Sequence, residues 1–479
     1  MLKSLHIENF KSWRSVELEF GKITAIFGTN SSGKSSLLQF LLLLKQTREA
    51  TDGGTVLELN SKFVELGSFS DLIYCHDSEL SLNWTLIFNA SPIILHNSNR
   101  DQKLRHRIYR KTIEISCSVA IKDDYLLNNK LGYKFDDGAG FDILPLNEMN
   151  DNTEYKFEPN QKMIETNDKY IKEREVELKK TIGRLGSVDK LSERNTVPSP
   201  IKSYLFSVPF IYSYMPYSGL TFMDVVRSYE LQFDSIYYIG PLRDYPKRDY
   251  PWSGSAPLEI GAKGEKTIDA ILARKSNKKQ NNQSINSPGI TEEISASLNK
   301  LKLIENFTVD RIAQTSNRWQ VTVKVKPDSP EVLLTEIGFG VSQILPVITQ
   351  LFYAPKGSTV ILEQPEIHLH PLAQAELADL LIQVAYKRDI QIIVESHSEH
   401  FLLRLQRRIA EQRFGEIQVK SDDIKLYFCD IIEGESQLIK LDLDEYGTIH
   451  NWPENFMGDA FGETAFAAKA AIKRRKADK

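Results

Sequence analysis

Cysteine is scarce in this sequence, which has three cysteines among 479 residues. Cys75, Cys117 and Cys429 lie far apart, so they show neither the spacing of a metal site nor that of a disulfide framework. Such sparing use of cysteine fits a reducing compartment. The first residues also lack a signal-peptide pattern, and we therefore expect a cytoplasmic protein.

Long apolar runs and an excess of one charge are missing as well. The longest apolar run, residues 40–44, is far too short to span a bilayer, so we expect no membrane association. A net charge of −4 does not indicate a nucleic-acid binder, although a local basic patch remains possible. There is no internal repeat, and the absence of sustained heptads argues against a long coiled coil. The composition, 41% hydrophobic and 26% charged, is that of a globular protein, and the length favours two or three lobes.

A phosphate-loop pattern stands near the start of the chain. Gly28 is followed by four residues and then by Gly33, Lys34 and Ser35. Residues 23–27 before it are apolar and β-branched, which predicts a buried strand. Residues 35–46 after it contain neither glycine nor proline, which predicts a helix. This context favours a phosphate loop over a chance Gly/Ser-rich turn with a surface lysine.

The chemistry of phosphate binding requires these residue types. Glycines let backbone N–H groups approach phosphate oxygens, and the helix N-terminus adds free N–H groups and a positive dipole end. We expect Lys34 to reach the β- and γ-phosphates and the Ser35 hydroxyl to bind Mg²⁺. The loop residues expected to contact ATP are Gly28, Thr29, Asn30, Ser31, Ser32, Gly33, Lys34, Ser35 and Ser36.

The sequence pattern changes twice along the rest of the chain. Residues 54–75 predict short strands, and residues 80–88 and 112–121 alternate like half-buried strands. Residues 150–200 are strongly polar, with a possible charged helix over 165–180, and residues 276–289 predict a mobile loop. We expect an ATPase lobe over 1–79, an α+β insertion over 80–235, a second ATPase lobe over 236–440, and a tail with a helix over 441–479.

An α/β rhythm returns in the second half of the chain. Residues 291–303 predict a helix, and 307–312 with 319–325 predict a hairpin. Helices over 341–353, 372–387 and 398–412 then alternate with strands over 358–362 and 390–394. Alternating strands and helices predict a parallel sheet that is covered on both faces.

Acidic residues and a histidine follow two of these predicted strands. Glu363 and Glu366 end the first strand, where Mg²⁺ and an attacking water belong beside a phosphate loop. His397 follows the second strand, within reach of a γ-phosphate. Taken singly, each residue could be an ordinary loop or helix-end residue, but their order after a phosphate loop favours a functional site.

A second possible anion site precedes the helix that we expect over 341–353. Residues 338–343 (GFGVSQ) place two glycines and Ser342 at its start. The alternative is that Ser342 only caps the helix.

These motifs resemble those of ABC-type ATPases of the chromosome-maintenance and recombination-repair kind. Within that group the resemblance is to a stand-alone branch related to the overcoming-lysogenization-defect ATPases. Residues 28–35 resemble the Walker A motif of that family, residues 338–343 its signature motif, and residues 361–366 (ILEQPE) its Walker B motif. His397 is similar to its switch histidine. Further similar segments are the opening motif 9–12 (NFKS), the D-loop 368–371 (HLHP), and the blocks 240–243 (GPLR) and 451–456 (NWPENF).

The resemblance implies a head with a mixed, largely parallel sheet flanked by helices, and an α+β insertion between Walker A and the signature motif. It also implies ATP and Mg²⁺ as cofactors, with Ser35 and Glu363 at the metal and Lys11 and Ser12 near the nucleotide. In that family two heads sandwich two ATP molecules, so Ser342 would act in trans on the nucleotide of the other copy. A homodimer or higher homo-oligomer is therefore expected.

One position departs from the family pattern. Two acidic residues usually end the Walker B strand, but here Glu363 is followed by Gln364. An amide cannot accept a proton as a carboxylate does. We therefore expect a slow ATPase, in which Glu363, Gln364, Glu366 and His397 form the catalytic set and Glu366 is a possible substitute for the missing carboxylate.

No other motif in the sequence predicts a second activity, such as nuclease activity, for this ATPase. Asp442 and Asp444 superficially suggest a metal pair, but a strand-end turn before Gly447 is the favoured interpretation. The basic run 473–476 ends an Ala-rich segment and favours a solvated helix end over a nucleic-acid patch.

Stand-alone ATPases of this branch are typical of bacterial antiphage systems of the Septu, retron-associated and PARIS types. The resemblance thus implies control of a separate nuclease or toxin effector, through which nucleic acid would be contacted. The alternative is a DNA-repair or recombination ATPase that binds DNA itself. A structural scaffold with a vestigial site is a third interpretation, disfavoured by the intact phosphate-loop residues.

Overall fold

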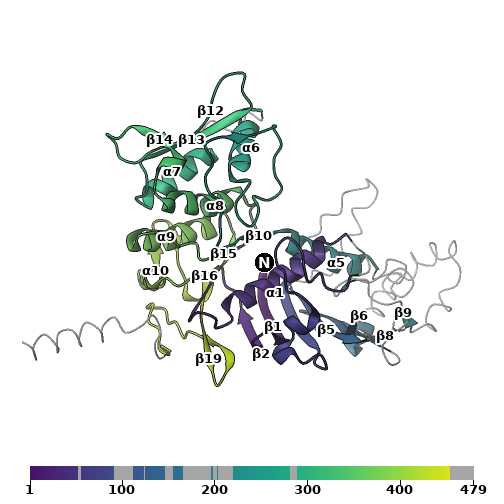
Figure 1. The fold of residues 1–479 in the computed structure, drawn as a ribbon. Helices are drawn as coiled ribbons and strands as arrows, with labels where there is room; N and C mark the ends of the chain where they lie inside the picture. Colours follow the sequence, from purple (N-terminus) through teal and green to yellow (C-terminus); the bar gives the residue numbers. More distant parts are fainter. Residues whose placement is uncertain are drawn as a thin grey trace, which may run out of the picture.

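The structure is a computed structural model that describes residues 1–51, 55–90, 112–122, 125–145, 155–165, 196–197, 202, 219–280 and 289–453. Two large sheets dominate the described residues (Figure 1). The first, called the antiparallel sheet, has the strand order β2-β1-β4-β5-β6-β7-β8-β9. Its strands are β1 (Leu2–Phe10), β2 (Trp13–Glu19), β4 (Leu82–Asn89), β5 (Thr112–Lys122), β6 (Tyr125–Phe135), β7 (Gly140–Pro145), β8 (Tyr155–Pro159) and β9 (Thr196–Val197).

The second sheet, called the mixed sheet, has the order β10-β15-β16-β3-β19-β20. Its first five strands run parallel and β20 pairs antiparallel to β19. The strands are β10 (Ile236–Ile239), β15 (Thr359–Glu363), β16 (Gln391–Glu395), β3 (Ile23–Gly28), β19 (Ile424–Ile432) and β20 (Glu435–Lys440). β3 lies inside the sheet, so its carboxyl end is flanked by the ends of β16 and β19.

Helices and two small sheets complete the described residues. The helices are α1 (Lys34–Glu49), α2 (Phe69–Leu72), α5 (Gly219–Asp234), α6 (Thr267–Gln280), α7 (Ile290–Lys300), α8 (Phe339–Tyr353), α9 (Pro371–Lys387) and α10 (Glu399–Ala410), with 3₁₀ turns η1 (Tyr74–His76), η3 (Leu334–Glu336) and η4 (Ser421–Asp423). The small sheets contain β11 (Tyr250–Pro251), β12 (Asn306–Arg311), β13 (Arg318–Lys324) and β14 (Glu331–Leu333), and β17 (Arg413–Phe414) with β18 (Ile417–Gln418).

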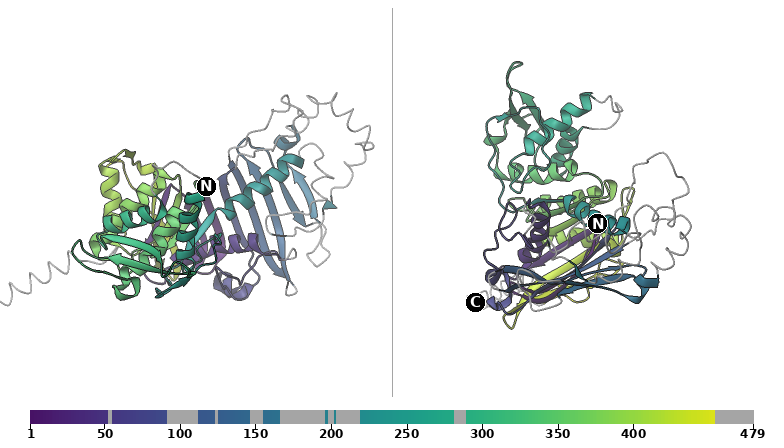
Figure 2. Two further views of the ribbon diagram at one scale, coloured as in Figure 1. Left: turned by 90° about the horizontal axis from the view of Figure 1, so that it is seen from above. Right: turned by 90° about the vertical axis from the view of Figure 1, so that its right-hand side faces the viewer.

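Helix α1 is buried on nearly all sides. Its leucine run, residues 41–44, is fully buried in a core that also contains inward-facing residues of both large sheets. Because α1 is covered on most of its sides, it can contain the longest apolar run of the sequence. Helix α5 lies across the antiparallel sheet, with the ring of Tyr229 6.1 Å from that of Phe88 (Figure 2).

The mixed sheet is covered on both faces, because alternate residues of its strands point to opposite sides. Ile26, Ile361 and Ile393 pack into the core that holds α1. Their neighbours in the chain, such as Phe27 and Leu362, pack into a second core with α8, α9 and α10. Helices α1 and α8 therefore lie on opposite faces of the mixed sheet (Figure 1).

The expected α/β fold with a mixed sheet flanked by helices is confirmed. The helices predicted over 341–353, 372–387 and 398–412 are present as α8, α9 and α10. Strands β4 and β5 extend the sheet of β1 and β2, so this sheet crosses the expected boundary at residue 79. The division of the chain into four parts remains a prediction.

Two local expectations were wrong. Residues 55–76 form a loop with two isolated bridges, Asn60 to Glu65 and Ile73 to Phe10, and short helical turns rather than strands, because their polar groups bond within tight turns. Residues 276–280 continue α6, since this run contains no glycine or proline to end the helix. The helix expected over 165–180, the basic run 473–476 and residues 281–288 lie outside the described residues. No helix among the described residues is long and apolar enough to cross a membrane.

A buried amide joins the two large sheets. Gln391, 2% exposed, donates to the carbonyl oxygens of Leu2 and Gly21 at 2.9 Å each and accepts from the Leu2 N–H at 2.9 Å. Thr359 also donates to it, at 3.1 Å. The starts of β1, β3 and β16 are therefore tied together through one side chain.

We expect Gln391→Ala to lower the free energy of unfolding by about 2–4 kcal/mol, because the buried backbone groups of Leu2 and Gly21 lose a side-chain hydrogen-bond partner. A thermal-shift measurement checks this against Gln437→Ala, a change on the exposed face of β20 that should cost less than about 0.5 kcal/mol. Equal midpoints for the two variants would contradict the prediction.

Candidate nucleotide site

The phosphate-loop pattern lies between β3 and α1, as the sequence predicts. Gly28 ends β3 with φ +145°, and a Cβ atom there would lie 2.2 Å from the carbonyl oxygen of Cys429 on β19. Gly33, with φ +90°, is the residue before α1. Its missing side chain leaves room for Ser12 and Ser436, whose hydroxyl oxygens would lie 2.9 Å from a Cβ. Glycine is therefore required at both ends of the loop.

Lys34 folds back over the loop that contains it. Its Nζ donates to the carbonyl oxygens of Gly28 at 3.2 Å and Thr29 at 2.5 Å. Burial lowers the pKa of Lys34, and the nearby Glu395 carboxylate opposes that shift. Ser32 also bonds within the loop, to the Thr29 carbonyl at 2.8 Å. The lysine thus lies where loop backbone and an incoming phosphate would compete for it.

The remaining loop residues are placed as follows. Thr29, Asn30 and Ser31 are exposed, and Ser31 has φ +62°. Ser36 donates its N–H to the Gly33 carbonyl at 3.1 Å as α1 begins. The exposed part of the loop is therefore open to a ligand.

The opening motif contributes two residues on different sides of the loop. Ser12 accepts a hydrogen bond from Ser436 at 2.7 Å and lies against Gly33. Lys11 instead donates to Gln39 on α1 at 2.6 Å. Ser12 is thus at the phosphate loop, whereas Lys11 is held along the helix that follows it.

The hydroxyl of Ser35 donates to Glu395 Oε2 at 2.9 Å. Glu395, for which the sequence analysis predicts no role, ends β16 directly beside β3. Burial raises its pKa, and the Ser35 hydrogen bond and Lys34 oppose that rise. The signal in the sequence is an acidic residue that ends an apolar strand two positions before His397.

Glu363 ends β15 one strand further from the loop. Its Oε1 accepts a hydrogen bond from the Tyr238 hydroxyl at 2.8 Å. Burial and the neighbouring Glu395 charge raise its pKa to about 7, while Tyr238 and Arg243 act in the opposite direction. Tyr238, also without a predicted role, lies on the adjacent strand β10.

Arg243 fastens the backbone that follows Glu363. It is 6% exposed and donates to the carbonyl oxygens of Glu363 at 2.8 Å and Gln364 at 3.3 Å. Gln364 has φ +44° and donates its N–H to the Glu395 carbonyl at 2.8 Å. A left-handed backbone at a non-glycine residue costs energy and persists only where its surroundings enforce it. Arg243 and the end of β16 supply that enforcement.

Glu366 is a buried support for the loop that carries His397. It is 6% exposed, and its Oε1 accepts the His397 N–H at 2.7 Å. Burial raises the pKa of Glu366, and burial lowers that of His397. The His397 residue is exposed at the same edge of the sheet. The structure thus brings Glu363, Gln364, Glu366 and His397 together, with Glu366 turned to the backbone.

Ser342 lies apart from these groups, on the first turns of α8. The helix starts after Gly338, so Ser342 does not cap it, and its hydroxyl donates to the Phe339 carbonyl at 2.9 Å. The ring of Phe339 lies 5.2 Å from that of Tyr245 and 5.8 Å from that of His368. These three rings, called the aromatic cluster, are exposed beside the signature motif.

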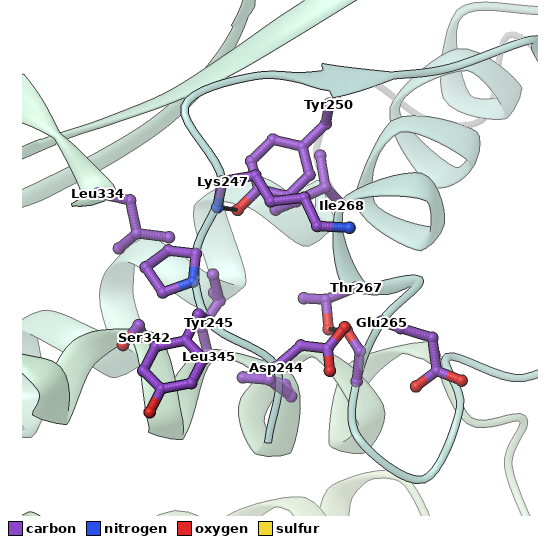
Figure 3. Close-up of a pocket in the computed structure, with 13 residues that line it drawn as sticks. Asp244, Tyr245, Lys247, Tyr250, Glu265, Thr267, Ile268, Leu334, Ser342 and Leu345 are labelled. Carbon is purple, nitrogen blue, oxygen red and sulfur yellow. Dashed lines mark hydrogen bonds between the residues drawn. The ribbon is translucent and has the colours of Figure 1, made fainter.

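A small cavity lies beside Ser342, between the residues that follow β10 and helices α6 and α8 (Figure 3). Its volume is about 40 Å³, and Lys247, Tyr250 and Thr267 are among its lining residues. Pockets that hold whole small ligands are roughly ten times larger. This cavity is therefore too small to hold a whole nucleotide.

The donor atoms near the loop suit Mg²⁺. The Ser35 hydroxyl and the carboxylates of Glu363 and Glu395 are hard oxygen ligands, and Mg²⁺ typically takes one or two carboxylates together with substrate phosphates. The described residues contain no group of three or more His, Cys, Asp or Glu residues that could hold a metal alone. Asp444 lies in a turn, where it accepts the N–H groups of Tyr446 and Thr448.

The family comparisons match most of the chain. A family model described as an AAA ATPase domain matches residues 1–402. A second model, described as a protein of unknown function (DUF3696), matches residues 419–465.

Among curated proteins, the chain is similar to the OLD nuclease of Thermus scotoductus, with 36% identity over 98 residues. The match covers 18% of this chain and 19% of that protein, so the chain spans about a fifth of the relative's length.

Among solved structures, similar chains include an SMC head bound to the C-terminal winged-helix domain of ScpA, with a TM-score of 0.44 at 14% identity over 93% of this chain and 98% of that one. The SMC head domain from Thermotoga maritima gives a TM-score of 0.36 at 12% identity, over 92% of this chain and 99% of that one.

We expect Gly28→Ala to destabilise the fold by about 1–3 kcal/mol beyond the cost of positive φ alone, because the new Cβ clashes with the Cys429 carbonyl. Gly357→Ala is the matched control, since Gly357 has φ +81° with no atom within 4 Å. That control should cost about 1 kcal/mol. Thermal midpoints measure both, and equal losses would contradict the clash.

Proposed function

The chain belongs to the AAA ATPase domain family, and from this premise we propose that it is an ATP-controlled switch. In this proposal ATP and Mg²⁺ bind at the phosphate loop, two copies close around the nucleotides, and hydrolysis reopens them slowly. The switch controls a separate effector protein. Each part of the proposal has its own support in the molecule.

Nucleotide binding is supported by the loop between β3 and α1. Lys34 and Ser35 follow two obligatory glycines, and exposed backbone at residues 29–31 faces solvent. When bound, Mg²⁺ neutralises charge between the β- and γ-phosphates. Ser35 and Glu363 are proposed to hold it, and Lys34 would exchange its carbonyl partners for phosphate oxygens.

Closure of two copies is supported by one observation above all: α1 and α8 lie on opposite faces of the mixed sheet. The phosphate loop therefore lacks Ser342 from its own chain, and a second copy would supply it. In the aromatic cluster beside Ser342, Tyr245 is 73% exposed. Exposed aromatic rings of this kind are typical of a surface that becomes buried on association. We propose a homodimer or a higher homo-oligomer, stabilised by ATP through mass action.

Slow hydrolysis is supported by the surroundings of Gln364. Gln364 directly follows Glu363, where the family pattern has a second acidic residue, and an amide is a poor base. Glu366 is turned to the His397 backbone N–H, which makes it a support rather than a substitute base. A long-lived ATP state suits a switch better than a motor.

The effector that we propose is a nuclease or toxin of a bacterial antiphage system. We propose that this system has a Septu-type layout, with a separate ATPase and effector. The match to an OLD nuclease supports a nuclease-related role. A second family model matches residues 419–465, which contain the strands β19 and β20 at one edge of the mixed sheet. Purification of the tagged chain from its host with and without ATP tests the proposal. A stoichiometric nuclease or toxin would support it, whereas recovery with DNA would favour the DNA-repair alternative.

We expect Gln364→Glu to raise steady-state ATP hydrolysis by roughly a hundred- to ten-thousand-fold, because a general base contributes about two to four orders of magnitude. Phosphate release at saturating MgATP measures the rate. Glu366→Gln should retain the wild-type rate, since its amide oxygen still accepts the His397 N–H. Rapid wild-type turnover that Glu366→Gln abolishes would refute this assignment.

We expect Ser342→Ala and Lys34→Ala each to lose ATP hydrolysis, and their mixture to recover it. A mixed dimer restores one complete site, so equal mixing returns about a quarter of the wild-type sites if copies exchange freely. Phosphate release over hours measures recovery. A mixture no more active than the sum of its parts would place Ser342 outside the partner's site.

A further inference from the structure

We propose that Glu395 is a second carboxylate of the Mg²⁺ site and positions the metal against Ser35. The inference rests on the proposed nucleotide site and adds a residue to it. Glu363 then becomes the more distant of two acidic residues at the metal, rather than the only one.

The strand order places Glu395 between Glu363 and the phosphate loop. In the mixed sheet β15 pairs with β16, and β16 pairs with β3. The register sets Glu363 opposite Glu395, and Glu395 opposite Ile26, two residues before the loop begins. Since neighbouring strands lie about 4.8 Å apart, Glu395 ends one strand spacing nearer to the loop than Glu363 does.

Side-chain contacts agree with this order. Ser35, whose hydroxyl is the expected metal ligand, donates to Glu395 Oε2 at 2.9 Å. Glu363 instead has its Oε1 at the Tyr238 hydroxyl, on the side away from the loop. Both carboxylates are buried, with Glu395 2% exposed. The buried carboxylate in contact with the metal-binding hydroxyl is therefore Glu395.

The chemistry of Mg²⁺ fits such a pair. Mg²⁺ keeps several waters and binds through one or two carboxylates together with phosphate oxygens. A carboxylate beside the Ser35 hydroxyl can contact the ion directly or through one of these waters, and in either role it fixes the ion's position. The charged form of a buried carboxylate at this place is also stabilised when a dication binds beside it.

A purely structural role makes a different prediction. If Glu395 only anchors the Ser35 hydroxyl, glutamine would do so equally, because its amide oxygen also accepts a hydrogen bond. Glu395→Gln therefore removes the charge while it keeps the anchor. Glu395→Asp keeps the charge but withdraws it from Ser35 by one methylene.

The experiment titrates Mn²⁺, as a spectroscopic probe for Mg²⁺, into protein saturated with a non-hydrolysable ATP analogue. Electron paramagnetic resonance counts the free ion. We expect Glu395→Gln to weaken Mn²⁺ binding at least about tenfold, and Glu395→Asp to weaken it measurably. Affinity for the analogue in EDTA should persist in both variants. The matched control is Glu331→Gln, an exposed change on β14 that should leave Mn²⁺ binding unaltered.

Each outcome decides the matter. Mn²⁺ affinity within twofold of wild type in Glu395→Gln overturns the proposal. If that variant fails to fold, unchanged Mn²⁺ binding by Glu395→Asp does the same. A wild-type chain that binds no ATP analogue refutes the proposed function itself, whereas normal analogue binding with an unaltered metal affinity in the variants refutes only the role of Glu395.

Discussion

The parallel pairing of β15, β16 and β3 is the constraint on which the rest of the site depends. These strands come from distant parts of the chain, yet their register sets Glu363 beside Glu395 and Glu395 beside the strand that leads into the phosphate loop. Carboxyl ends of parallel strands meet at one edge, so loop, acids and His397 share that edge by geometry. The two cores on the faces of the sheet maintain the register, because a one-residue slip would exchange their apolar sets.

This constraint explains how much the sequence could reveal. Gly28, Gly33, Lys34 and Ser35 were predictable, because a phosphate loop is a local pattern whose strand and helix are also local. The contact of Ser35 with Glu395 was not, because it depends on which strand lies next to β3, and pairing between distant segments leaves no local trace. The role of Gln391 at the sheet junction was hidden for the same reason.

Buried polar groups account for the other surprises. From the sequence, Glu366 is a possible substitute for the missing second carboxylate. In the structure it is buried, and its Oε1 accepts the His397 N–H and so supports the backbone there. Arg243 is likewise buried at the turn that follows β15, where it holds two carbonyl oxygens. Such groups are costly to bury and cost more to leave unpaired, so they fix local geometry. The turn that carries Gln364 is therefore held by hydrogen bonds from Arg243 and to the end of β16.

The restrained backbone at Gln364 fits the slow hydrolysis that we propose. Hydrogen bonds from Arg243 and to the end of β16 restrain the left-handed backbone at Gln364, and the side chain at this position is an amide, which is a poor base. The Lys34 ammonium is meanwhile satisfied by loop carbonyls, so binding of a phosphate exchanges hydrogen bonds instead of creating them. In the proposed switch, the contact between the two copies would therefore contribute most of the free energy that separates the closed state from the open one. The proposed switch would therefore respond to whether a partner is present more than to how fast ATP is consumed.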